Sequence, residues 1–235
     1  MVARKHPLAV VRPSVTVLQL DTDFPRVPGD VGSPETYIGD VEILRIPNAT
    51  VGQIVSADPA VIPIAPFEQA MRQATGDLIV TSCGFLSYWQ THLQAQTDRP
   101  FISSALIALP DLLTRFSPQD ILTVTFDADS LNTHHIGDIQ PDVIGLPKDS
   151  HLRQVISHNS PTLDQALARQ EITDLVASQC KPHHKHILLE CTNLPPYKSA
   201  ITSQTGLDVS DILTCIETKR PSTIAPMFLA GEMRI

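Results

Sequence analysis

The chain has 235 residues, of which 42% are hydrophobic and 18% are charged, and its formal net charge is −8. This composition is typical of a folded globular protein rather than a disordered chain, and it argues against nucleic acid as a partner, because phosphate binding needs clustered Lys and Arg. No apolar run approaches the roughly 20 residues that span a bilayer, so we expect no membrane segment.

The first residues, MVARKHPLAVVRPS, contain an apolar stretch that ends at Arg12-Pro13, which is too short for the core of a signal peptide. The chain has four widely spaced cysteines without a CxxC pair: Cys83, Cys180, Cys191 and Cys215. In a cytosolic chain of this size, such cysteines are free thiols rather than a disulfide framework. The sequence therefore predicts a cytoplasmic protein.

Short apolar runs along the chain predict buried parallel strands. They lie at 14–20, 41–46, 77–82, 121–126, 142–146 and 186–190. Helical patterns lie between many of them, at 66–75, 85–96, 104–116 and 162–178, the last with Ser160-Pro161 as its predicted start. Strands that alternate with helices predict an α/β fold with right-handed crossovers.

One connection in this pattern is long. Residues 21–40 (DTDFPRVPGDVGSPETYIGD) are rich in turn-forming residues and have no regular periodicity. Loops of this length in compact domains are usually functional or disordered. This loop leaves the end of the first strand, and ligands of open α/β sheets bind at the carboxyl ends of strands. We expect it to contact substrate, although an ordinary surface excursion is the alternative.

Two strands end in the same way, each running into a cysteine. Cys83 follows DLIVTS, and Cys191 follows HILLE, about half the chain further on. The repetition suggests two related lobes that face each other, although short apolar runs that end in Cys also arise by chance. Two strand-end thiols in facing lobes would bracket a small ligand between them.

The surroundings of the two cysteines favour acid/base chemistry. We expect each thiol to lie at the N-terminus of a following helix, which lowers the pKa of a thiol. Compact polar side chains flank both thiols: Thr81, Ser82, Thr192 and Asn193. They suit a carboxylate or a developing enolate oxygen. Two acid/base groups on opposite faces of one carbon are what inversion of a stereocentre requires.

The other clusters of histidines and cysteines give weaker evidence of function. The His-rich string 180–186 (CKPHHKH) and the pair His134-His135 match none of the usual zinc spacings, and the string has the character of an exposed connector, so no metal site is predicted. One histidine of the pair remains open as a cleft residue. Cys180 and Cys215 are predicted to pack in the interior. There is no GxGxxG after a strand and no GxxxxGK[ST], so no nucleotide cofactor is implied.

Three segments, LQLDTDFPR, VTSCGFL and LLECTNLPPY, resemble the aspartate/glutamate racemase superfamily. This cofactor-independent group also contains hydantoin racemases, maleate isomerases and arylmalonate decarboxylases. The likeness covers most of the chain in order and spacing. Where the superfamily motif commonly has Gly-Cys-Thr-His, this chain has Glu190 in place of the Gly and Asn193 in place of the His. It also departs after the first cysteine, where Gly84-Phe85 replaces Asn-Thr, and in the first loop, which has fewer glycines.

The resemblance implies two similar doubly wound α/β lobes with the active site between them. The first lobe would comprise residues 1–99 plus 206–235, and the second residues 100–205. Cys83 and Cys191 would be the acid/base thiols. Residues of the motifs and of the first loop would bind substrate: Asp21, Thr22, Arg26, Thr81, Ser82, Gly84, Thr192 and Asn193.

The resulting hypothesis is a cofactor-independent racemase or epimerase that inverts the α-carbon of an amino acid or related acid by two-base proton transfer. The alternatives are a cysteine-nucleophile isomerase of the maleate type and a non-catalytic homologue that binds a small acid. The partner would be a small carboxylate, and a homo-oligomer is compatible with the sequence. Asp21 has turn capping as its alternative role, Arg26 has a solvated surface position, and Lys198 is expected to be a helix-surface charge.

Overall fold

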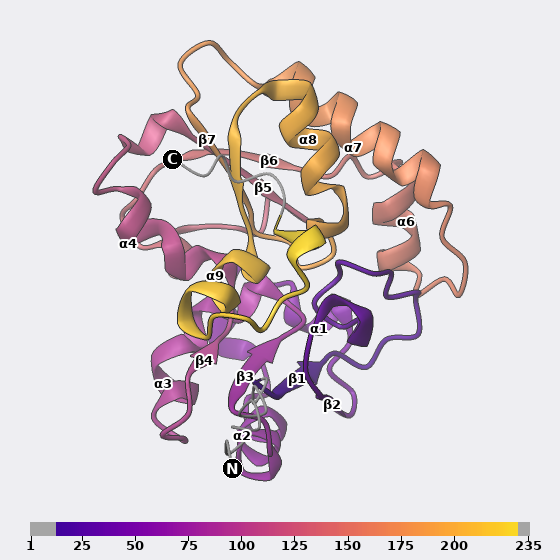
Figure 1. Ribbon diagram of the computed structural model, residues 1–235, viewed down its shortest axis with the longest axis vertical. Coiled ribbons are helices and arrows are strands. Elements are labelled where there is room, and N and C mark those ends of the chain that lie inside the picture. The colour runs from indigo at the N-terminus through magenta and orange to yellow at the C-terminus, as the bar shows by residue number, and fades with distance from the viewer. Residues whose placement is uncertain (1–12, 230–235) are drawn as a thin grey trace, which may run out of the picture.

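The computed structural model describes residues 13–229, so the inference about the N-terminal stretch rests largely on residues 1–12, outside the described part. Two four-stranded sheets, each entirely parallel, form two lobes that lie one above the other (Figure 1). The first contains β1 (Val15–Gln19), β2 (Val41–Arg45), β3 (Leu78–Thr81) and β4 (Phe101–Ile102). The second contains β5 (Ile121–Thr125), β6 (Asp142–Gly145), β7 (His186–Leu189) and β8 (Asp208–Ser210).

The two sheets have the same topology. Their strand orders are β2-β1-β3-β4 and β6-β5-β7-β8, so the third strand in sequence lies beside the first in both lobes. The central strands β3, β5 and β7 are buried throughout, whereas the edge strands β2 and β6 are half-exposed. Burial on both faces explains why the predicted runs at the centre of each sheet are apolar throughout. The predicted α/β fold with two similar lobes is confirmed.

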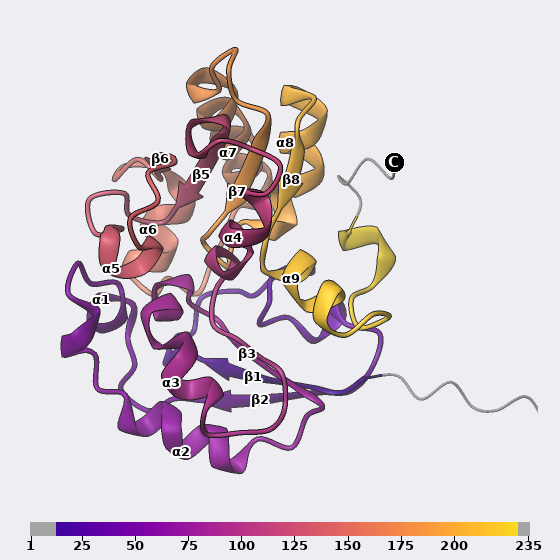
Figure 2. The ribbon, with the colours of Figure 1, turned by 90° about the vertical axis from the view of Figure 1, so that its left-hand side faces the viewer.

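Helices flank both sheets, as Figure 2 shows for α2 below the first sheet and α8 beside the second. The first lobe has α1 (Val51–Ile54), α2 (Ala65–Gln73) and α3 (Gln90–Gln94), and α4 (Leu109–Leu112) leads to the second. The rest are α5 (Thr133–Ile136), α6 (His151–Ser157), α7 (Gln165–Gln179), α8 (Lys198–Thr205) and α9 (Ile212–Lys219). Each lobe has its own apolar core.

Three of the predicted helices differ in the structure. The prediction at 85–96 is a 3-10 helix, Gly84–Trp89, that continues into α3. The prediction at 104–116 is likewise divided, because Pro110 has no backbone N–H to donate and lies in the first turn of α4. Ser160-Pro161 does not begin α7. Asp164 caps it instead, accepting hydrogen bonds from the backbone N–H groups of Ala166 and Leu167, both at 3.0 Å.

Contacts between the lobes place the cavity described below. α1 of the first lobe packs against α6 of the second, and α9 contacts both β8 and β4. The lobe boundaries expected at residues 99 and 206 stay predictions. β8 lies beyond residue 206 and pairs with β7 in the second sheet. Within residues 13–229, no helix has the length and apolar character required to cross a membrane.

Candidate active site

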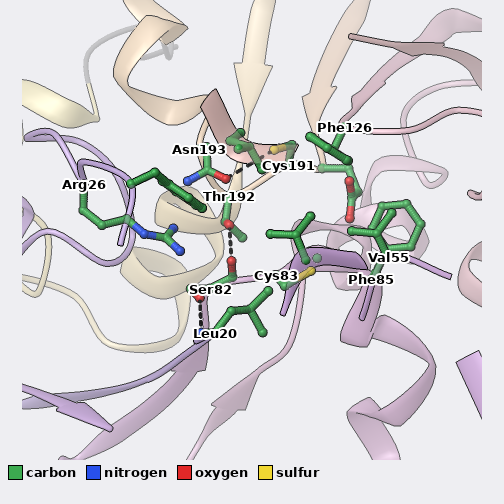
Figure 3. A pocket seen from close by; sticks show the side chains of 15 residues that line it. Leu20, Arg26, Val55, Ser82, Cys83, Phe85, Phe126, Cys191, Thr192 and Asn193 are labelled. Carbon is green, nitrogen blue, oxygen red and sulfur yellow. Dashed lines mark hydrogen bonds between the residues drawn. The ribbon is translucent and has the colours of Figure 1, made fainter. Parts of the chain in front are cut away.

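A narrow cavity lies between the lobes, at the carboxyl ends of β1, β3, β5 and β7, and both strand-end cysteines line it (Figure 3). It encloses about 350 Å³ free of protein atoms, part of which is open to solvent. The lining residues are Leu20, Phe24, Arg26, Val51, Val55, Ser82, Cys83, Gly84, Phe85, Phe126, Ile156, Glu190, Cys191, Thr192 and Asn193. Seven of the ten site residues predicted from the sequence line this cavity. It lies at the carboxyl ends of the strands, where parallel sheets bind ligands.

Cys83 lies two residues after the end of β3, directly before the 3-10 helix Gly84–Trp89. Its side chain is buried, and burial raises the pKa of the thiol to about 12. The negative charge of Glu190 raises this pKa further, while the backbone N–H of Phe85 and the charge of Arg26 lower it. The expected lowering of the thiol pKa by a helix N-terminus is therefore wrong, because desolvation outweighs the backbone donor.

Cys191 occupies the equivalent place in the second lobe, two residues after the end of β7. Burial raises the pKa of its thiol well above the ordinary value, and the charges of Glu190, Cys83 and Asp30 act in the same direction. Its Sγ donates a hydrogen bond to Oδ1 of Asn193 at 3.8 Å. All four cysteines of the chain are free thiols, as predicted.

Glu190 is the functional candidate that sequence reasoning missed. It lines the cavity, is 0% exposed, and accepts a 2.6 Å hydrogen bond at Oε2 from the hydroxyl of Thr125. Burial raises the pKa of its carboxyl to about 7. Oε1 has no hydrogen-bond partner within the described part of the chain. A carboxylic acid that titrates near neutrality in a cavity with two thiols is suited to acid/base or electrostatic roles.

Gly84 leaves the space that Glu190 fills. A Cβ atom built on Gly84 would lie 2.0 Å from Oε1 of Glu190 and 2.6 Å from its backbone oxygen. No other residue type fits at position 84 while the Glu190 side chain keeps this position. The two departures from the superfamily motif, Gly84 and Glu190, therefore contact each other. Their joint occurrence was the sequence signal that could have identified Glu190 as a site residue.

The loop at 21–40 brings a guanidinium to the cavity. Arg26 stacks over the ring of Phe24, 4.3 Å from its centroid, and its side chain is only 9% exposed. It donates hydrogen bonds to Thr22 Oγ1 at 3.2 Å and to Asp30 Oδ1 at 3.3 Å. Nε of Arg26 is buried and has no partner among residues 13–229. An unsatisfied buried donor in a cavity is suited to an anionic ligand.

Hydrogen bonds across the cavity fix the motif residues. The hydroxyl of Thr192 donates to the backbone oxygen of Ser82 at 2.7 Å, and Nδ2 of Asn193 donates to Asp30 Oδ2 at 2.6 Å. Ser82 in turn accepts from the backbone N–H of Leu20 at 3.0 Å. These bonds tie the second-lobe motif to the first loop and to the end of β3, so the wall of the cavity is held from both lobes.

Other predicted binding residues lie outside the lining. Asp21 forms an ion pair with Arg45 at 2.5 Å and accepts from the backbone N–H of Asn48. Thr81 donates to the backbone oxygens of Ser103 and Cys83. Thr22 accepts a hydrogen bond from Arg26, which lines the cavity. Their contact with substrate stays a prediction.

Lys198 is not the surface charge that the sequence predicted. It is 1% exposed, with Nζ 3.0 Å from the hydroxyl of Thr214 and 3.6 Å from Asp211 Oδ2. The helix face that carries it packs against the protein interior, which a lysine in a polar segment does not reveal. Of the other cysteines, Cys215 is buried as expected, while Cys180 is half-exposed at the end of α7.

The His-rich string forms the one group of potential metal ligands found among residues 13–229: Asp142, His183 and His184. Lys181 Nζ already lies 2.7 Å from Asp142 Oδ2. Nδ1 of His184 accepts from the backbone N–H of Lys181, so Nε2 carries the proton and donates to Asp142. The side chains therefore satisfy one another as an ion-paired surface cluster.

Several solved structures similar to this one are racemases. Allantoin racemase from Pseudomonas fluorescens superimposes with a TM-score of 0.58 over 94% of this chain and 98% of the other, at 13% identity. A glutamate racemase from Bacillus anthracis gives a TM-score of 0.54 over 90% of this chain and 84% of the other, also at 13% identity. The chain therefore shares the fold of these racemases, as the resemblance in the motifs implied.

The curated relatives point to a different activity. Dimethylsulfoniopropionate lyase 6 of Emiliania huxleyi (strain CCMP1516) is 28% identical over 233 residues, which cover 88% of this chain and 59% of the relative. Dimethylsulfoniopropionate lyase of Durusdinium sp. clade D is 27% identical over 216 residues, 85% of this chain and 71% of the relative. The chain thus spans about three fifths of the length of the Emiliania relative. No family model matches the chain.

These relatives overturn the prediction of an amino-acid racemase. They are enzymes, and all those found carry the name of a lyase, not of a racemase or isomerase. The reason for the error is chemical: proton removal, the step predicted for the two thiols, is common to inversion and elimination. The thiols do not specify what happens to the carbanion after the proton has left.

Proposed function

We propose that this chain is a lyase that cleaves dimethylsulfoniopropionate by elimination. The observation that carries the proposal is the name shared by its curated relatives, whose matches cover 85–88% of this chain in the two cases described. The cavity supports it with a buried guanidinium at one end and a buried carboxyl among apolar residues.

The substrate's chemistry defines what the cavity must do. Dimethylsulfoniopropionate has a carboxylate at one end and a dimethylsulfonium cation at the other, joined by two methylene groups. A base removes a proton from the carbon next to the carboxylate, and that C–H electron pair forms the new C=C bond. The C–S bond breaks with its electrons on sulfur. The products are dimethyl sulfide and acrylate, so the step needs no oxidant, reductant or water.

Arg26 and Asn193 are the proposed carboxylate-binding groups. The partnerless Nε of Arg26 supplies a charge-assisted donor, which is stronger than a neutral hydrogen bond. Such a donor also stabilises the negative charge that develops on the carboxylate oxygens as the proton leaves. Asp30 holds both side chains, through Oδ1 to Arg26 and Oδ2 to Asn193, so the two donors are oriented before substrate arrives.

Cys83 is the proposed base. The charge of Glu190 opposes both thiolates, but the charge of Arg26 favours that of Cys83, whereas Cys83 and Asp30 further oppose that of Cys191. Burial raises the pKa of both thiols, and a sulfonium cation bound beside them would lower it, because an opposite charge favours the ionised form. Cys191 then completes the cavity wall as the second thiol of the site.

The test is product formation by the purified chain. Incubated with dimethylsulfoniopropionate, it should release dimethyl sulfide, measured by headspace gas chromatography, and acrylate, measured by NMR, in equal amounts. Boiled protein provides the blank, and the Emiliania lyase provides the positive control. A folded protein that releases neither product under conditions in which the control is active would rule out the proposal.

A further inference from the structure

We infer that Glu190 recognises the cationic end of the substrate, so that the cavity selects a zwitterion with a permanent positive charge over a carboxylate of the same shape that lacks the cation. The inference rests on the proposed function of the same cavity and adds to it a substrate class, the onium carboxylates. It concerns the residue that the resemblance to racemases leaves without a role, since their common motif has glycine at this position.

The carboxyl group of Glu190 is held in place but only half satisfied. Thr125 donates to Oε2, and the backbone N–H of Glu190 donates to Val124, so the side chain leaves the end of β7 in a fixed direction. Oε1 is buried against Gly84 without a donor in the described chain. A buried acceptor left without a partner costs free energy, and a bound cation would offset that cost.

The neighbours of Glu190 are suited to a methylated cation. Thr125, its hydrogen-bond partner, directly precedes Phe126, and Gly84, its contact, directly precedes Phe85. Both phenylalanines line the cavity. The faces of aromatic rings attract cations that have no N–H group to donate. Figure 3 shows Phe85 and Phe126 on the opposite side of the two cysteines from Arg26 and Asn193.

The cavity therefore has two ends of different chemistry. Arg26 of the first loop supplies positive charge at one end of the cavity, and Glu190 supplies negative charge at the other end, beside the aromatic rings. Dimethylsulfoniopropionate has the complementary order of charges, with its reacting carbons between them. A carboxylate of the same size without the cation would satisfy Arg26 and leave the carboxylate of Glu190 buried without a counter-charge, which is costly.

Titration of Glu190 gives this recognition a pH dependence. Without a cation, burial raises the pKa of Glu190 to about 7, and a bound cation favours the ionised form. The other ionisable groups around the cavity are Cys83, Cys191, Arg26 and Asp30, with His135 behind Phe85. Burial holds the pKa of both thiols far above 7 and that of His135 at about 4. Selectivity for the cation should therefore increase as pH rises from 6 to 8.

The experiment compares two unreactive probes of the same shape. 3-(Trimethylammonio)propanoate carries the cation, and 4,4-dimethylpentanoate replaces its nitrogen by carbon. Isothermal titration calorimetry with the full chain gives the ratio of their dissociation constants. We expect wild type to bind the cationic probe at least about tenfold more tightly than the other probe at pH 8, a ratio that one pair of partly desolvated charges can supply. The ratio should be smaller at pH 6.

Glu190→Gln keeps the shape and removes the charge, so the ratio should fall to about one and lose its pH dependence. Glu190→Asp, which keeps the charge, should retain part of the preference. Glu42→Gln is the matched control, because Glu42 also accepts a 2.6 Å hydrogen bond from a threonine, Thr16, but lies outside the cavity lining. It should behave as wild type.

The inference fails if folded Glu190→Gln keeps the wild-type ratio, if wild type shows no preference, or if wild type binds neither probe at millimolar concentration. These outcomes are separable from the lyase proposal. Release of dimethyl sulfide without a Glu190-dependent ratio would leave the function standing and remove the recognition role. A Glu190-dependent ratio without product would do the reverse.

Discussion

The ends of β3 and β7 are equivalent positions in two lobes of the same topology, yet they carry different chemistry. The backbone N–H of Ser82 donates to Leu18, and that of Glu190 donates to Val124, each the penultimate residue of the neighbouring first strand. Each of the two is followed by a cavity cysteine. The backbone arrangement is thus repeated, and the side chains of Ser82 and Glu190 are the difference.

That difference makes the cavity asymmetric in charge. The hydroxyl of Ser82 is satisfied by the backbone N–H of Leu20, so it adds no charge and leaves no unpaired group. Glu190 adds an ionisable group with one oxygen unsatisfied. Two thiols in matched settings are suited to moving a proton in either direction, as inversion requires. Two thiols in unlike settings are better suited to a one-way step such as elimination, in which a single proton leaves.

The strongest test of this asymmetry is to replace each thiol separately. Cys83→Ser should lower kcat for release of dimethyl sulfide by about 10²- to 10⁴-fold, the usual contribution of a positioned base, because a hydroxyl is a far weaker base than a thiolate. Cys191→Ser should cause a smaller loss. Initial rates measured by headspace gas chromatography would check this. A larger loss in Cys191→Ser would assign the base to the second lobe, and full activity in both variants would remove the thiols from the mechanism.

Much of the architecture could be predicted from the sequence, because buried parallel strands leave apolar runs that need no knowledge of their neighbours. All six predicted strands are present to within about one residue at each end. The two that were missed, β4 and β8, have two and three residues and lie at sheet edges. A pattern so short has no detectable period. The helix boundaries failed where a proline or a cap, not the apolar period, decides them.

The two cysteines of the site were predictable because the same motif occurs once in each lobe. Cys83 and Cys191 follow equivalent strands, so both could be placed in one cavity before the structure was known. Glu190 could not, because an acidic residue after a strand is normally solvated. Its burial depends on Gly84 and on Thr125, which other segments of the chain supply. The choice between inversion and elimination depends on the substrate's leaving group, which no thiol motif encodes.

The second test uses the stability cost of burying Glu190. Its pKa is raised in the folded state from 4.5 to about 7. A raised carboxyl pKa gives stability that is fully present below pH 4.5 and is lost as pH rises to 7, because the unfolded chain releases its proton first. Relative to Glu190→Gln, the free energy of unfolding of wild type should therefore fall by about 3 kcal/mol over this range.

Urea unfolding of both proteins at pH 5, 6, 7 and 8 would measure the difference, and the comparison cancels the titration of groups that the two proteins share. Glu42→Gln is again the control. The pKa of Glu42 is lowered by donors from Thr16 and Thr75, so its effect should appear only below pH 4.5. A wild-type curve parallel to that of Glu190→Gln between pH 5 and 7 would mean that folding does not raise the pKa of Glu190.

The third and smallest effect concerns the other end of the cavity, where two arginines near the first loop can be compared. Arg26 faces the cavity with Nε free of partners in the described chain, while Arg45 pairs with Asp21 and Asp23 at 2.5 and 2.8 Å outside the lining. Arg26→Ala should raise KM for dimethylsulfoniopropionate by about 10- to 100-fold, since a hydrogen bond to a charged group contributes about 1.5–3 kcal/mol. Arg45→Ala should leave KM within about twofold, because exposed ion pairs contribute little. Equal effects of the two substitutions would mean that Arg26 acts by shaping the loop, through Phe24 and Asp30, and not by binding the carboxylate.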